Sequence, residues 1–267
     1  MRIVVFLGLF IPVILAGLSV YTFRINKKFL KILVAFSGAY LISLVFNELI
    51  PRIYSSLALK SLHETGGQEI IEQHNHSMHY VVGLLILGGF FIQLFLDYLT
   101  KGIEHGHVGH DHSHNEQEIK HEHTVSFIPI LFGLLLHSFL EGMPLADGLS
   151  TFDLQNRLLT GIIIHNIPIS IVLVSLMIQS NITKLKAVIF LIIFSLSAPL
   201  GALLTNILGV QILGNTDTFF NYIMAVVVGI FLHISTTILF ETDENHRFNF
   251  IKFITMILGA LAAIVHF

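Results

Sequence analysis

Long apolar runs constrain this chain more than any other feature of its sequence. A helix that crosses about 30 Å of hydrocarbon needs roughly 20 mainly apolar residues. The sequence contains eight such runs, at approximately 3–22, 29–50, 78–99, 125–149, 157–179, 185–210, 218–240 and 249–266. Only 12% of the 267 residues are charged, against about a quarter in soluble domains. The sequence therefore predicts an all-α integral membrane protein, with eight transmembrane helices in a single domain, residues 1–267, inside a lipid bilayer.

The basic residues predict how these spans are oriented. Eight spans place both termini on one side, and Lys and Arg are enriched in cytoplasmic loops. If the termini face outward, the outward segments keep four of the 14 basic residues, and the other ten face inward. We therefore expect both termini outside the cytoplasm, in a plasma or inner membrane. The first run directly follows Met1 and Arg2 and shows no small-residue cleavage pattern, so we interpret it as a retained span.

The segment 100–124 is rich in histidine and contains almost no apolar side chains. Such a composition cannot bury enough surface to offset the entropy of ordering, so we expect a disordered, His-rich cytoplasmic loop. Imidazoles at alternating positions favour weak binding of a divalent metal, and the alternative is a solvated linker. Its histidines are His105, His107, His110, His112, His114, His121 and His123. A smaller polar loop, 60–79, carries four more histidines on the opposite side.

Ionisable residues inside the spans are costly in lipid and point to function. His137 and Glu141 are four residues apart, which places both on one helical face. His165 and Asn166 precede Pro168, which removes a backbone donor and exposes a carbonyl. The chain has no cysteine, so two imidazoles and a carboxylate are its natural ligands for a zinc-like ion. The alternative is a His–Glu hydrogen bond that only locks two helices together.

Two further polar positions leave alternatives open. No Lys or Arg lies within the apolar part of a span, so we expect Glu48 and Glu141 to lack a counter-charge. Each must then be protonated or accompanied by a cation. His233 precedes Ser235, Thr236 and Thr237, where a packing hydrogen bond and a metal ligand are equally consistent.

Several motifs together resemble the ZIP (Zrt/Irt-like) family of divalent metal transporters. HSFLEG in the fourth span is similar to the family's His-Asn-x-x-Glu-Gly, and HNIPIS in the fifth to its His-Asn-x-Pro-Glu-Gly. ELIP in the second span, SAPLGALL in the sixth and GIFLHIS in the seventh resemble further family signatures. The resemblance covers essentially the whole chain, and it also fits eight spans with a His-rich cytoplasmic loop after the third.

The resemblance implies a role for individual residues. His137, Glu141 and His165 match the family's principal transport site, and Asn166 matches a position of its second site. Two departures remove ligands: Ile169 stands where the family usually has a carboxylate or histidine, and Ser138 where it often has asparagine. We therefore expect one working metal site, with Glu48 as a candidate replacement ligand.

The sequence thus predicts a carrier that moves a divalent transition metal, with zinc as the first candidate, towards the cytoplasm. No enzymatic activity and no nucleic-acid partner are expected. The alternatives are a metal exporter and a non-transporting metal sensor or scaffold derived from a carrier. An intramembrane metalloprotease is disfavoured because no HExxH motif occurs. Small-residue faces at 201–202 and 259–263 permit close helix contacts, including those of a homodimer.

Overall fold

The computed structural model describes residues 3–23, 25–56, 68–100, 127–146, 152–211, 216–240 and 250–265, and these residues form helices with no strand. The elements are α1 (Ile3–Ser19), α2 (Lys27–Leu44), the π-helix η1 (Val45–Leu49), α4 (Gln68–Thr100), α5 (Phe127–Gly142), the 3₁₀ turn η3 (Met143–Leu145), α6 (Phe152–Gln179), α7 (Lys184–Gln211), α8 (Thr216–Phe240) and α9 (Phe250–Val265). Residues 50–56 continue the second helix beyond η1.

Each of the eight predicted apolar runs lies on a helix. Among the described residues, six helical segments are long and apolar enough to cross a membrane. The other two, α1 and α9, are apolar but shorter, with 17 and 16 residues. The predicted all-α membrane fold is confirmed.

Some helix ends differ from the prediction. The helix α4 begins at Gln68 and has 33 residues, so the prediction of a loop over 60–79 is wrong for 68–79. At 1.5 Å per residue α4 is about 50 Å long, which exceeds the hydrocarbon thickness of a bilayer. The predicted run 125–149 is helical only to Gly142, because Pro144 interrupts the pattern and residues 143–145 form a 3₁₀ turn. The seven loop histidines lie outside the described residues.

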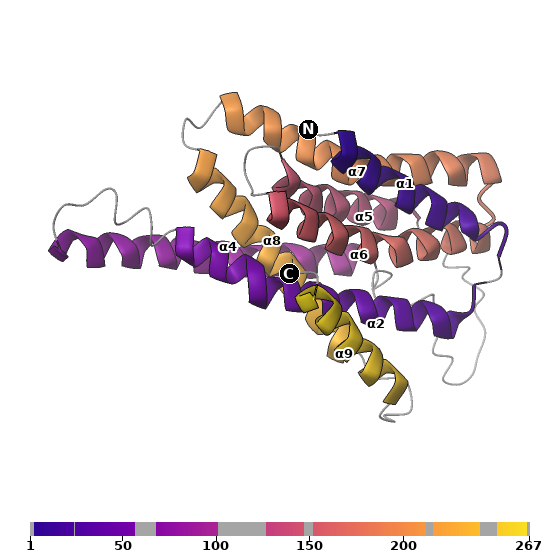
Figure 1. The fold of residues 1–267 in the computed structure, drawn as a ribbon. Coiled ribbons are helices and arrows are strands. Elements are labelled where there is room, and N and C mark those ends of the chain that lie inside the picture. Colours follow the sequence, from indigo (N-terminus) through magenta and orange to yellow (C-terminus); the bar gives the residue numbers. More distant parts are fainter. Residues whose placement is uncertain are drawn as a thin grey trace, which may run out of the picture.

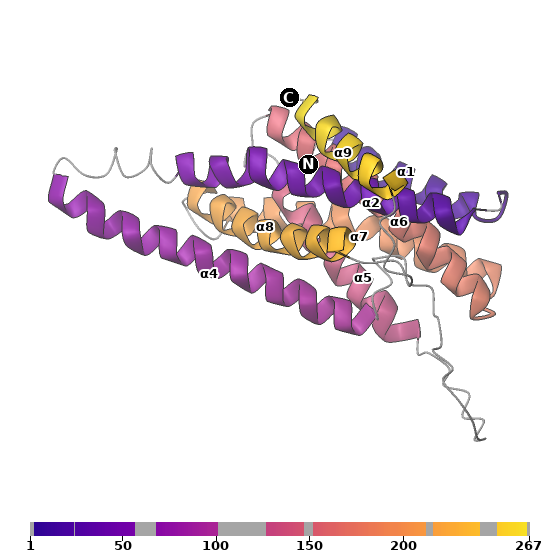
Figure 2. The same cartoon turned by 90° about the horizontal axis from the view of Figure 1, so that it is seen from below.

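The helices pack mainly in four pairs: α4 with α8, α2 with α9, α1 with α6, and α5 with α7. Figure 1 shows α1, α5, α6 and α7 grouped on one side of the molecule, with α2 and α9 on the other. Figure 2 shows α4 running beside α8 along the length of the bundle. Large apolar side chains of α4, α7 and α9 are exposed, as expected of surfaces that face lipid.

Glycines let α5 approach its neighbours closely. A Cβ added to Gly142 would stand 2.6 Å from the carbonyl carbon of Ala198 on α7. On α7, a Cβ added to Gly201 would stand 3.0 Å from the carbonyl carbon of Phe139 on α5. Such small residues permit backbone contact between helices. These contacts fix the position of α5 along the axis of α7 within narrow limits.

Candidate metal site

One face of α5 carries an imidazole and a carboxylate one turn apart. His137 Nε2 lies 3.2 Å from Glu141 Oε1, and both side chains are completely buried. The spacing of four residues brings the two groups together on the inner face of the helix. The sequence pattern in this span therefore produces the local geometry directly.

The helix α6 supplies two more polar groups to the same place. His165 Nε2 lies 3.9 Å from Glu141 Oε1, and its ring stands edge-on to that of His137, with centroids 5.7 Å apart. Asn166 Nδ2 donates a hydrogen bond of 3.2 Å to Glu141 Oε2. The helix continues through Pro168, which has no N–H to donate. The two oxygens of Glu141 thus face His165 and Asn166 on α6.

The spacing of these groups suits a small divalent cation. One ligand atom each from His137, Glu141 and His165 lies within 4.8 Å of the others. Ligands at 2.0–2.2 Å around a tetrahedral zinc ion stand about 3.4 Å apart, and the distances of 3.2 and 3.9 Å bracket that value. Within the described residues Glu141 Oε1 accepts no hydrogen bond although it is buried. A bound cation would satisfy this oxygen, which is otherwise costly in lipid.

Asn166 and Ser138, the two smaller predicted ligands, are placed differently. The side-chain oxygen of Asn166 is buried beside Glu141 and has no hydrogen-bond partner in the part of the chain that is described. This oxygen is therefore available to coordinate a metal ion or to accept a hydrogen bond from a water molecule. Ser138 is also buried. As the residue directly after His137, it is turned about 100° around α5 from that side chain.

Glu48 lies in a different environment from the one predicted. Arg157 Nη1 on α6 donates a hydrogen bond of 3.3 Å to Glu48 Oε2, and Arg52 lies 3.6 Å from Oε1. The expectation that Glu48 lacks a counter-charge is therefore wrong. Arg52 follows Glu48 by one helical turn, so this pair could have been predicted from the sequence. Arg157 is 109 residues away, and only the packing of α6 against the second helix brings its charge to Glu48. Glu48 is not part of the cluster of candidate ligands.

Ile169 and His233 also lie outside the ligand cluster. Ile169, one turn after His165, is buried among apolar residues that include Ile130 and Leu134 of α5. His233 lies edge-on to Phe90, with ring centroids 4.9 Å apart. Its backbone oxygen accepts hydrogen bonds from Thr236 and Thr237.

Gln93 on α4 contacts the site, although the sequence analysis did not select it. Its Oε1 lies 2.9 Å from His137 Nδ1, and the side chain is completely buried. The signal was present in the sequence as a polar amide inside the apolar stretch that precedes Asp97. The partner lies 44 residues away and could not be read from that stretch.

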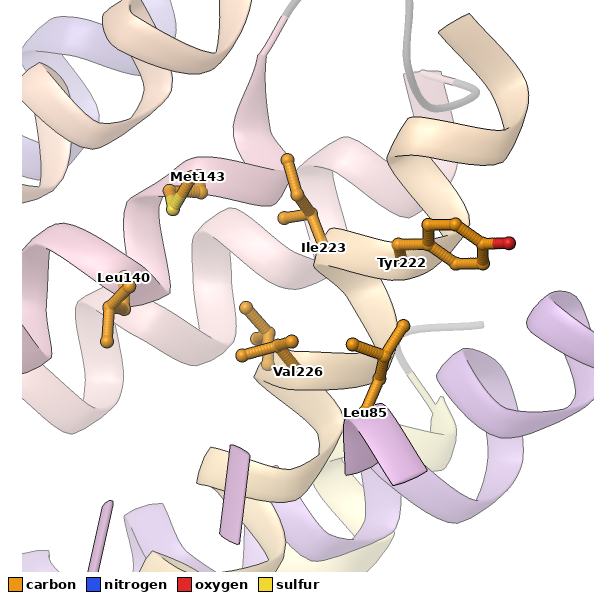
Figure 3. A pocket seen from close by; sticks show the side chains of 7 residues that line it. Leu85, Leu140, Met143, Tyr222, Ile223 and Val226 are labelled. Atoms are coloured by element: carbon orange, nitrogen blue, oxygen red, sulfur yellow. The ribbon is translucent and has the colours of Figure 1, made fainter. Parts of the chain in front are cut away.

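A cavity of about 240 Å³ lies between α4, α8, the end of α5 and η3. It is lined by Leu85, Leu140, Met143, Tyr222, Ile223, Val226 and Val227. In Figure 3 the Tyr222 hydroxyl points away from the other labelled side chains. The lining is therefore apolar, and none of the three candidate ligands contributes to it.

These features define an integral membrane protein with a buried cluster of His and Glu ligands between two of its apolar helices. Residues 104–265 match the model of the ZIP zinc transporter family. Because this match covers more than half of the chain, the protein belongs to that family.

Curated relatives are similar over part of their length. The chain is 26% identical over 147 residues to zinc transporter ZIP9-B of Xenopus laevis. The aligned region covers 53% of this chain and 46% of the relative. Zinc transporter ZIP9 of Xenopus tropicalis matches to the same extent. The match to ZIP9 of Micropogonias undulatus is 26% over 137 residues, or 50% and 41% of the two chains. The chain thus spans about half the length of the curated relatives it matches.

Proposed function

We propose that this protein transports a divalent transition metal ion, with zinc as the first candidate, across a membrane. The ion binds to His137, Glu141 and His165, and Asn166 supports Glu141 through its hydrogen bond. The membership of the ZIP zinc transporter family and the names of the ZIP9 relatives support this choice of substrate.

The observation that carries the proposal is the burial of this cluster inside apolar helices. His137, Glu141 and His165 are at most 1% exposed, and α5 and α6 are both candidate membrane spans. A carboxylate at such a position is costly unless a cation accompanies it. Two imidazoles and a carboxylate are ligands that zinc accepts, and a water or the oxygen of Asn166 can supply the fourth.

The proposal includes one working metal site, because the position that could bridge to a second ion is apolar. Ile169 contributes no ligand and lies in an apolar cluster that includes Ile130 and Leu134 of α5. Glu48 is already neutralised by two arginines, so its use as a replacement ligand requires these ion pairs to open. A single site with few ligands releases its ion more readily than a closed, fully liganded structural site.

The proposal also includes an orientation and a direction of transport. We propose that both termini lie outside the cytoplasm, that the segment 100–124 lies inside, and that metal moves inward.

The glycines that permit close helix contact are used within the chain: Gly201 packs on α5, and Gly259 packs on Phe36 of α2. A homodimer would therefore need another surface.

Zinc uptake by reconstituted vesicles tests the proposal. His137→Ala and His165→Ala should each nearly abolish uptake, because each removes one of three ligand side chains. His233→Ala is the matched control, since His233 is also a buried histidine but lies outside the cluster, and its uptake should stay within about twofold.

The outcomes separate transport from its rivals. Near-normal flux in both His137→Ala and His165→Ala would refute the assigned site. Wild-type protein that binds zinc without moving it would instead identify a sensor or scaffold. Zinc movement only out of the cytoplasmic side would identify an exporter.

A further inference from the structure

We propose that Gln93 is a positioning residue for the metal site and acts through His137. Its side-chain oxygen accepts the proton on His137 Nδ1, which leaves the lone pair on Nε2 available for the metal. This inference rests on the proposed function in one respect, namely that His137 is a ligand.

The location of Gln93 on α4 is unusual for that helix. The neighbouring Phe91 and Phe95 are 56% and 60% exposed, as expected of a surface that faces lipid, whereas Gln93 is 0% exposed. Burying an amide without hydrogen-bond partners is costly. The side chain is directed instead towards α5, where it meets His137.

Close packing of α4 against α5 sets the point along the two helices at which Gln93 meets His137. A Cβ added to Gly133 would stand 2.7 Å from Thr100 Cγ2 and 3.4 Å from the backbone oxygen of Leu96. The numbering rises along one helix as it falls along the other, so the two helices run antiparallel. Gly133 is one turn before His137, and Leu96 is one turn after Gln93. The same interface therefore brings the amide to the imidazole.

The two nitrogens of His137 face different partners. Nδ1 lies 2.9 Å from Gln93 Oε1, and Nε2 lies 3.2 Å from Glu141 Oε1. A neutral imidazole carries one proton and one lone pair. An acceptor at Nδ1 holds the proton there, so the lone pair of Nε2 points towards Glu141, where the cation would sit. Histidine ligands commonly depend on such a partner for ring orientation and tautomer.

A neutral amide oxygen suits this role in lipid. It orients the ring without bringing a second carboxylate into the membrane, which would carry its own desolvation cost. A methionine at the same position would have a similar length but only a weakly accepting sulfur. The substitution Gln93→Met therefore removes the acceptor while keeping most of the packing.

Zinc affinity in detergent, measured by competition with a chelating dye, tests this role. Gln93→Met should weaken zinc binding about 10- to 100-fold, the usual effect of losing such a partner. In a His137→Ala background the same substitution should change the affinity less than about twofold, because its route of action is gone. Gln93→Glu, which keeps an oxygen acceptor, should restore most of the wild-type affinity.

Gln155→Met is the matched control. Gln155 is also a buried glutamine, and its Nε2 donates a hydrogen bond of 2.9 Å to the backbone oxygen of Leu145. It lies near the start of α6, ten residues or about 15 Å along the helix before His165. This variant should therefore bind zinc within about threefold of wild type. A loss equal to that of Gln93→Met would show that removing any buried amide weakens the site, and would overturn the proposal.

A second readout is the tautomer itself. Nitrogen NMR of ¹⁵N-histidine-labelled protein without metal, with the His137 signal assigned by its absence in His137→Ala, should show the proton on Nδ1 in the neutral ring. Gln93→Met should shift that population towards the Nε2–H form. A wild-type ring protonated on Nε2 would overturn the proposal, and this measurement decides alone if the Met variant does not fold. Absence of zinc flux would refute the proposed transport but would leave both binding and tautomer results interpretable.

Discussion

Gly142→Ala should displace the metal ligands without removing any of them. The added Cβ would stand 2.6 Å from the carbonyl carbon and 2.8 Å from the Cα of Ala198, whereas ordinary contacts begin at 3.4 Å. The carbonyl oxygen of Ala198 would be nearer still. Because backbone atoms cannot rotate away, α5 and α7 must separate by more than about 0.8 Å or shift along each other. Glu141 is the preceding residue, so its carboxylate moves with this strain.

The expected effect on metal binding is larger than that on folding. A misplacement of about 1 Å in a functional site can cost on the order of 100-fold, so we expect zinc affinity to fall by about 10- to 100-fold. Overpacking costs about 1–3 kcal/mol, and the higher helix propensity of alanine returns about 1 kcal/mol of this. The variant should therefore fold and enter the membrane.

The assay is zinc affinity in detergent together with thermal unfolding without metal. Gly83→Ala on α4 is the control, because an added Cβ there meets nothing within 4 Å, and both properties should match wild type. Gly142→Ala with unchanged zinc affinity would refute the reasoning. It would mean that α7 yields instead and that the position of Glu141 does not depend on this contact.

Three other predictions concern residues outside the ligand cluster. Arg157→Gln should lower the unfolding temperature more than the double variant Arg157→Gln with Glu48→Gln, because the single change leaves a carboxylate in the membrane with only Arg52; a double-mutant cycle with no coupling would contradict this. Glu48→Gln should leave zinc affinity within about threefold of wild type, and a tenfold loss measured by dye competition would restore Glu48 as a ligand. Deleting 104–123 should leave basal zinc uptake intact but change its response to metal on the cytoplasmic side, and loss of all flux from correctly inserted protein would show that this segment is part of the path.

Features repeated within one helix could be predicted from the sequence. The apolar runs located the helices because hydropathy is local, and the interval from His137 to Glu141 fixed a shared face because the helical period is local. The start of α4 at Gln68 could not be found in this way. Its first turns are polar, and hydropathy reports where a helix enters lipid but not where the helix begins.

Contacts between helices could not be predicted, because they depend on how the helices pack in register. The pairs Gln93 with His137 and Glu48 with Arg157 join residues 44 and 109 positions apart. Both depend on close helix contacts, such as that of Gly133 with α4 and that of Gly161 with Tyr40 on α2. The periodicity of a single helix contains no information about these distances, although a buried polar residue in each span indicates that a partner exists.

Ile169→Glu tests whether the apolar side chain at this position sets the number of bound ions. Ile169 follows His165 by one turn and is buried in an apolar cluster. A carboxylate there would lie on the same side of α6 as the imidazole. Without metal, an added intramembrane carboxylate costs about 2.5–3.5 kcal/mol, and the variant should unfold at a lower temperature than wild type. With zinc, the carboxylate gains a cation, and this difference should shrink or reverse.

The functional consequence is a trade between binding and release. Tighter binding deepens the well that a transported ion must leave, so Ile169→Glu should bind zinc more tightly, with a stoichiometry that can rise towards two, and should turn over more slowly. Ile169→Gln is the control, because it is polar and of similar length but adds no charge. If Ile169→Glu and Ile169→Gln show the same zinc stoichiometry, affinity and turnover, the side chain at this position does not reach the ion, and the single-site behaviour must have its origin in the spacing of His137, Glu141 and His165 alone.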